Sequence, residues 1–219
     1  MSGKTPPVTF APLGDSAIMV TLGGVIDREL NRRVHACVRH LARSAWPEVS
    51  DIVPAYSSFA VHYDPLRVTS AGITDRVRAA LRDVPRDDAE TEGSLVTIPV
   101  RYDGPDLEAV ADATRKNVEE VIALHSAGSY HVYMMGFAPG FAYLGDLDPA
   151  LHLPRHATPR TRVPSGSVGI AGAQTAVYPV ETPGGWHLIG RTDLLLFDAQ
   201  RDPPALLHSG DRVKFERIE

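Results

Sequence analysis

The stretch that decides the fold begins with GFAPGFAYLG at residues 136–145 and runs to Gly190. Residues 136–190 hold nine of the 18 glycines and seven of the 18 prolines in this 219-residue chain. Frequent turns between short apolar runs are typical of a closed or nearly closed β-barrel. The expected barrel strands are residues 131–135, 168–171, 176–178, 186–189, 194–197 and 213–218.

Upstream of this stretch, strand and helix signals alternate in the order ββαββα. Ile26, Leu30, Val34, Cys37 and Leu41 recur at steps of three and four, which predicts an amphipathic helix that stops by residue 47. A second apolar stripe over residues 73–84 predicts another helix. The order predicts a small sheet with helices on one face. The expected strands are residues 8–10, 17–22, 52–55 and 59–63.

Residues 85–93, PRDDAETEG, form the most polar stretch of the chain. We interpret them as a linker between an N-terminal α/β sandwich domain, residues 1–84, and a barrel domain, residues 94–219. The fold class is therefore α+β. The alternative is that the polar stretch is a surface loop within one domain.

The barrel domain is expected to start with a strand over residues 95–101 and two short helices. Asp106 is placed to cap a helix that runs to Ala113, and the spacing of Asn117 and Glu120 predicts a capping box. The second helix should end near Gly128.

Composition excludes several functional classes. The net charge is −5 and no dense Lys/Arg run is present, so nucleic-acid binding is not expected. No apolar run reaches the ~20 residues that span a bilayer, and the N-terminus lacks a signal-peptide core, so we expect a cytoplasmic protein without a membrane segment. Cys37 is the only cysteine and is expected in the core.

Histidine spacing gives a weak metal signal. His152 and His156 have the spacing of two ligands on one helix face, but Pro154 between them argues against a helix. No metal is therefore expected in this chain.

Three segments could carry chemistry. The aromatic residues of 136–145 either form a binding loop or plug the barrel end. The glycines of VPSGSVGIAG, residues 163–172, either form an anion-binding nest or make tight turns. In residues 174–186, Gln174, Tyr178 and Glu181 could orient a small polar substrate. Arg191 could pair with a carboxylate or phosphate, or lie on the surface.

Together these three segments, with LGDSAIMV near the N-terminus, resemble the family that contains the B-type chain of 5-oxoprolinase, the kinase inhibitor KipI and allophanate hydrolase subunit 1. The resemblance runs from about Phe10 to the C-terminus. It implies a cyclophilin-like β-barrel as the second domain.

The resemblance also implies a function that needs other chains. In the complete 5-oxoprolinase, the B-type chain acts with a homologous C-type chain and with an A-type chain to open 5-oxoproline to glutamate, using ATP as co-substrate. The expected role is a subunit that is inactive alone and forms part of a shared pocket. The alternatives are a subunit of urea or allophanate metabolism and an inhibitor of a sensor histidine kinase. An exposed partner surface could produce homo-oligomers.

The motifs supply the expected site residues. Gln174, Glu181 and Arg191 are assigned to catalysis. The positions assigned to substrate binding are Phe137, Pro139, Gly140, Phe141, Tyr143, Pro164, Gly166, Gly169, Gly172, Tyr178, Gly184, Gly185 and Trp186.

Overall fold

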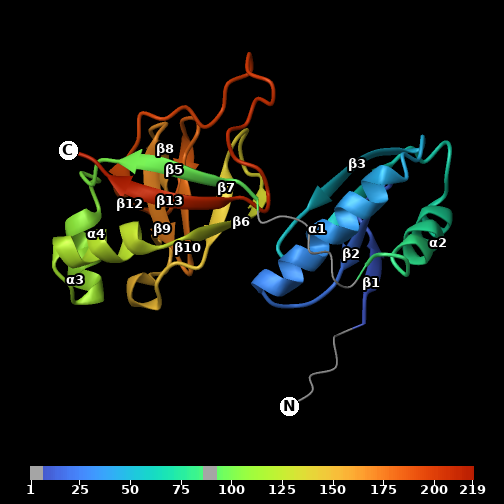
Figure 1. Ribbon diagram of the computed structural model, residues 1–219, viewed down its shortest axis with the longest axis horizontal. Helices are drawn as coiled ribbons and strands as arrows, with labels where there is room; N and C mark the ends of the chain where they lie inside the picture. The colour runs from blue at the N-terminus through green and yellow to red at the C-terminus, as the bar shows by residue number, and fades with distance from the viewer. Residues whose placement is uncertain (1–6, 86–92) are drawn as a thin grey trace. The chain divides into compact units, whose positions relative to one another are not determined.

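The computed structural model describes residues 7–85 and 93–219. The chain divides into two compact units, Met1–Thr91 and Glu92–Glu219, which Figure 1 draws from blue to green and from green to red. The predicted linker lies almost entirely outside the described residues, so its role stays a prediction.

The first unit is an antiparallel sheet with strand order β1-β2-β4-β3 and two helices packed against it (Figure 1). Its elements follow the predicted order ββαββα. They are β1 (Thr9–Pro12), β2 (Ala17–Thr21), α1 (Arg28–Arg43), β3 (Val49–Pro54), β4 (Ser58–Tyr63) and α2 (Ser70–Ala80).

One core joins both helices to the sheet of the first unit. Alternate residues of β4, among them Phe59 and Val61, belong to the same buried cluster as Val34 of α1 and Ile73 of α2, as the period of two in a half-buried strand requires. Ile26 was predicted to extend the apolar stripe of α1, but it precedes the helix and is 58% exposed. The helix begins later because the side chain of Asp27 caps it.

The second unit is built on a seven-stranded sheet of order β12-β9-β10-β7-β6-β13-β5, with a separate pair, β11-β8. Neighbouring strands of the large sheet are antiparallel except for β13 and β5. The elements are β5 (Leu95–Val100), α3 (Leu107–Thr114), α4 (Val118–Ala127), β6 (Tyr130–Met135), β7 (Ala142–Gly145), the 3₁₀ turn η1 (Pro149–Leu151), β8 (Arg160–Val163), β9 (Ser167–Ala171), β10 (Gln174–Val177), β11 (Thr182–Gly184), β12 (His187–Arg191) and β13 (Arg212–Arg217).

The two edge strands of this sheet meet, which nearly closes it into the predicted barrel. Arg101, just after β5, and Arg191, at the end of β12, exchange two backbone hydrogen bonds of 2.9 and 2.8 Å. We call this contact the seam. A Cβ on Gly190 would lie 2.5 Å from the carbonyl oxygen of Arg101, so only glycine lets the strands approach this closely.

The strand predictions for the second unit need two corrections. Residues 194–197 form no strand. They belong to a loop in which Leu196 is buried and Leu195 is 54% exposed, so their apolar character reflects packing of a loop. Three further strands were not predicted: β7, which lies within the glycine-rich motif, β8, which has two arginines, and β11, which is only three residues long.

The helices of the second unit pack beside the barrel (Figure 1). Asn117 and Glu120 form the predicted capping box, with bonds of 2.9 and 2.7 Å. Within the described residues, no helix is both long and apolar enough to cross a bilayer.

Candidate functional site

Aromatic side chains from two of the three motif segments, residues 136–145 and 174–186, meet in one cluster. The ring centroid of Phe141 lies 5.0 Å from that of Tyr143, 5.4 Å from that of Tyr178 and 5.9 Å from that of Trp186, with edge-on geometry in each pair. Such pairs add about 0.5–1.5 kcal/mol each beyond their buried area. We call these four residues the aromatic cluster. Phe141, Tyr178 and Trp186 are buried, and Tyr143 is partly exposed.

Phe137 stands at the outer side of this cluster. Its ring is 5.2 Å from that of Phe141, yet the residue is 60% exposed and has a φ of 70°. A bulky residue in the left-handed region carries strain of roughly 1–2 kcal/mol. Phe141 therefore packs into the barrel, as the plug interpretation predicts, while Phe137 stays accessible and its role in binding stays a prediction.

The turn at Pro139 and Gly140 fixes this loop. Gly140 has a φ of 77°, and a Cβ there would lie 2.6 Å from the Cβ of Phe197. The amide of Phe141 also donates to the carbonyl of Ala138 at 3.0 Å. The tip is thus packed against the loop that contains Phe197.

The second motif makes turns and a strand. The amide of Gly166 donates to the carbonyl of Tyr178, and the amide of Gly172 donates to the carbonyl of Leu153, each at 2.7 Å. Gly169 lies inside β9, between β10 and β12. The anion-nest interpretation is therefore wrong for the amides of Gly166 and Gly172, which are already bonded to carbonyl oxygens.

The third motif brings Gly184, but not Gly185, against the aromatic cluster. A Cβ on Gly184 would lie 2.4 Å from the hydroxyl oxygen of Tyr178. At Gly185 the nearest atoms would be 3.7 Å away. Burial raises the pKa of Tyr178. Pro164, also predicted to bind substrate, lies in the turn before β9 and accepts a 2.7 Å hydrogen bond from the hydroxyl of Ser167.

The three residues assigned to catalysis lie apart. Gln174 pairs with Ala171 at one end of β9, whereas Arg191 pairs with Ser167 at the other end. Ser167 and Ala171 are four residue steps apart along β9, or roughly 13 Å at 3.3 Å per step. Glu181 forms a 2.6 Å ion pair with Arg162 at the surface. Their assignment to catalysis stays a prediction.

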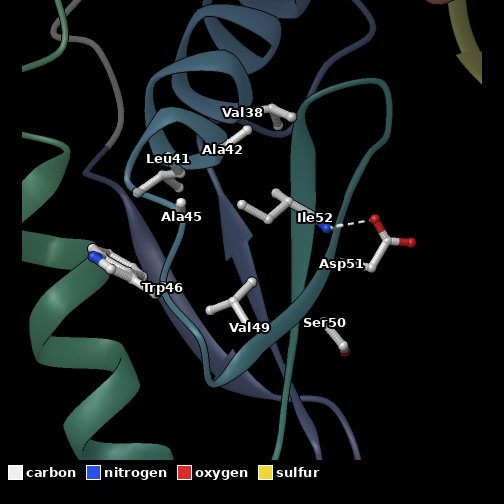
Figure 2. A pocket seen from close by; sticks show the side chains of 9 residues that line it. All are labelled: Val38, Leu41, Ala42, Ala45, Trp46, Val49, Ser50, Asp51 and Ile52. Atoms are coloured by element: carbon white, nitrogen blue, oxygen red, sulfur yellow. Dashed lines mark hydrogen bonds between the residues drawn. The ribbon is translucent and has the colours of Figure 1, made fainter.

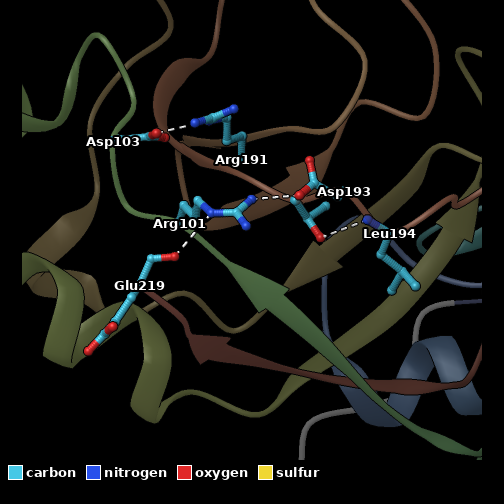
Figure 3. A network of polar contacts seen from close by, with 7 residues as sticks. Arg101, Asp103, Arg191, Asp193, Leu194 and Glu219 are labelled. Atoms are coloured by element: carbon cyan, nitrogen blue, oxygen red, sulfur yellow. Dashed lines mark hydrogen bonds and ion pairs between the residues drawn. The ribbon is translucent and has the colours of Figure 1, made fainter.

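Figure 3 shows the surroundings of Arg191. Its Nε donates to the carboxylate of Asp103 at 2.8 Å, while 57% of its side chain is exposed. Beside it, Arg101 bonds Asp193 at 2.5 Å and holds the pKa of that carboxyl below its usual range. These pairs surround the seam.

A hollow of about 440 Å³ adjoins this network. Asp103, the partner of Arg191, is one of its lining residues. The lining is completed by Tyr102, Gly104, Pro105, Leu107, Glu108 and Val118.

A polar cluster lies beside Trp186, which precedes His187 in the chain. Asp106 is buried and accepts bonds from Arg160 at 2.6 Å and from the amide of Leu188 at 2.7 Å. Burial alone would raise its pKa, but these donors hold it below its usual value. The rings of His156 and His187 are tilted by 45° with centroids 4.0 Å apart, and Nε2 of His156 is 3.4 Å from Asp106.

The prediction that the side chain of Asp106 caps a helix is wrong. Asp106 precedes α3 as predicted, but its side chain forms no capping bond. The carboxylate instead connects segments 50 and 82 residues away. No local spacing signals such a cluster.

The first unit has a separate hollow of about 250 Å³ between α1 and β3. Figure 2 shows Trp46, Leu41 and Ile52 among the side chains that line it. No residue assigned to the site from sequence is among those lining residues.

Comparison with known proteins identifies the family. The family described as carboxyltransferase domain, subdomains C and D, matches residues 8–207. The chain belongs to this family. It is 45% identical to the B chain of 5-oxoprolinase from Bacillus subtilis (strain 168) over 218 residues, which cover 94% of this chain and 91% of that protein.

Solved structures share the fold. The crystal structure of TTHA0988 matches 93% of this chain at 40% identity with a TM-score of 0.83, and this chain spans 40% of its length. The Kluyveromyces lactis urea carboxylase matches 97% of this chain and 22% of its own length at 20% identity, with a TM-score of 0.80. The latter likeness shows the fold alone. It confirms the predicted α+β class with a barrel-like second unit.

Proposed function

We propose that this chain is the B-type component of an ATP-dependent 5-oxoprolinase, which acts with a C-type and an A-type chain. The observation that carries the proposal is the 45% identity to the corresponding 5-oxoprolinase chain over nearly the full length of both proteins. The aromatic cluster adds support, because residues from two separate motifs meet there.

The proposed reaction explains the need for ATP. A lactam carbonyl is a poor electrophile because the ring nitrogen donates electrons into it. Transfer of the γ-phosphoryl group of ATP to the lactam oxygen makes the ring carbon more electrophilic. Water then adds to that carbon, the carbon–nitrogen bond breaks as the nitrogen takes a proton, and hydrolysis releases the phosphate.

In this proposal, the chain supplies one side of the pocket. Phe137 and Tyr143, the accessible edge of the aromatic residues, would cover the lactam and exclude water. Arg191 would stabilise negative charge, with its guanidinium held in place by Asp103. The second chain would complete the pocket, so the isolated chain should not turn over 5-oxoproline.

Reconstitution tests this function. The purified chain is combined with the C-type and A-type chains encoded in the same genome, and release of phosphate and glutamate is measured. We expect ATP hydrolysis that depends on 5-oxoproline and on all three chains. Failure of the complete mixture to consume 5-oxoproline, with turnover of urea or allophanate instead, would refute the proposed substrate.

Arginine variants test the proposed charge stabilisation. Arg191→Ala should lower kcat by roughly 10²-fold, the usual effect of losing a preorganised charge partner. Arg217→Ala is the matched control, because Arg217 is 52% exposed and forms a comparable surface pair with Glu119. Equal turnover of both variants and the wild type would remove Arg191 from the mechanism.

A further inference from the structure

The cluster around Asp106 contains the donor set of a transition-metal site. One ligand atom from each of Asp106, His156 and His187 lies within 4.8 Å of the other two. Two imidazoles and a carboxylate are the ligands of many zinc enzymes, in which the remaining position binds water or substrate.

One distance within this set fits a shared metal better than a hydrogen bond. Nε2 of His156 and Oδ2 of Asp106 are 3.4 Å apart, which is long for a charge-assisted bond. Two ligands held at about 2.1 Å from one zinc ion with tetrahedral angles lie roughly 3.4 Å apart. The ligand atoms of the set lie at most 4.8 Å apart, so a movement of no more than about 1.4 Å would complete the same geometry.

The outer contacts of these residues also match a metal site. Nε2 of His187 lies 2.8 Å from the carbonyl oxygen of Pro154, so it carries the proton and leaves Nδ1 for a metal. Metal-binding histidines usually donate their second nitrogen to a carbonyl or carboxylate in this way. Arg160 and the amide of Leu188 fix the carboxylate of Asp106.

We propose that Asp106, His156 and His187 bind one divalent transition-metal ion of the zinc type, with an open coordination position. His156 and His187 are partly exposed, so an ion can reach them from solvent. Arg160 already neutralises part of the charge of Asp106, so the affinity should be lower than in a site made of thiolates. This proposal is independent of the reaction proposed above.

Metal titration of the purified full chain tests the proposal. The protein is first freed of metal with a chelator and then titrated with Co²⁺, whose visible absorption reports coordination geometry, and with Zn²⁺ by calorimetry. We expect one ion per chain and a four-coordinate Co²⁺ spectrum. His156→Gln and His187→Gln should each weaken binding at least about tenfold.

His152→Gln is the matched control. His152 is exposed, lies on the same segment and is not part of the cluster, so its loss should leave the metal affinity unchanged. Circular dichroism of the metal-free variants checks that they fold. Asp106→Asn is less suitable, because it also disturbs Arg160 and Leu188.

Either of two results would overturn the proposal. The first is that neither Zn²⁺ nor Co²⁺ binds at one ion per chain. The second is that both ions bind with the same affinity to the wild type and to the His156 and His187 variants.

Discussion

A buried histidine makes the stability of the second unit depend on pH. His125 on α4 is fully buried and stacks on Phe215 with centroids 4.5 Å apart. Thr175 donates its hydroxyl proton to Gly169, so it accepts from Nε2 of His125 at 2.9 Å, and Nδ1 then accepts from the hydroxyl of Tyr102 at 2.8 Å. Both ring nitrogens of His125 are therefore hydrogen-bonded when the ring is neutral.

Burial lowers the pKa of His125 to about 3. In the unfolded chain the pKa of His125 is about 6.5. As the pH falls, His125 is therefore protonated in the unfolded state before it is protonated in the folded state, which stabilises the unfolded state. The contribution to stability is therefore complete above about pH 6.5 and is lost progressively between about pH 6.5 and 3. Between about pH 7 and 5 the loss is about 2 kcal/mol.

Tryptophan fluorescence can isolate this effect. The chain has two tryptophans, Trp46 in the first unit and Trp186 in the second, so Trp46→Phe leaves a reporter of the second unit alone. Urea unfolding of this variant is compared with and without His125→Gln at several pH values. The difference in unfolding free energy between the two proteins should fall by about 2 kcal/mol from about pH 7 to 5.

The test is how the difference in unfolding free energy between the two proteins changes with pH. Its absolute value is not, because His125→Gln also changes packing and lowers the stability at every pH. His152→Gln controls for loss of an exposed histidine in the same unit. A difference in unfolding free energy that stays constant over the whole range would refute the reasoning, since a neutral buried imidazole must produce the slope.

Three further predictions concern single side chains. Gly184→Ala should destabilise the second unit by about 1–3 kcal/mol, because its Cβ would lie 2.4 Å from the hydroxyl oxygen of buried Tyr178. Gly185→Ala, the control, should change the unfolding free energy by less than about 0.5 kcal/mol. Urea unfolding compares the two variants. Phe137→Gly should relieve about 1 kcal/mol of left-handed strain, which offsets the lost ring contact with Phe141, so the Tm of the isolated chain should change little. Turnover of the reconstituted enzyme should fall. Asn117→Ala should lower the stability of the second unit by about 1 kcal/mol through loss of the capping box, and Asn117→Asp should restore most of it, as thermal unfolding can measure.

The sequence predicted those parts of the fold that local patterns determine. The order ββαββα, the capping box at Asn117 and the barrel-like second unit follow from periodicity, caps and turn residues, and the structure confirms each. Strand β7 was missed because its short sequence, AYLG, lies within a glycine-rich motif. Its identity as a strand depends on partners in β6 and β10.

The candidate site was predicted only in part, since its geometry depends on long-range contacts. Phe141 and Trp186 were expected near one another and do meet. The sequence did not predict that Asp106 and His187 lie close together, because they are 81 positions apart in the chain. The bond between Asp103 and Arg191 was also unforeseen, as it spans 88 residues.

The parallel pairing of β5 with β13 has a consequence for synthesis in the cell. Residues 95–100 find their parallel partner only in residues 212–217, so the large sheet cannot be completed until residues 212–217 have left the ribosome. Until then, nascent β5 lacks this neighbour, and its apolar residues are open to chaperones. All elements of the first unit, in contrast, leave the ribosome well before β13 does.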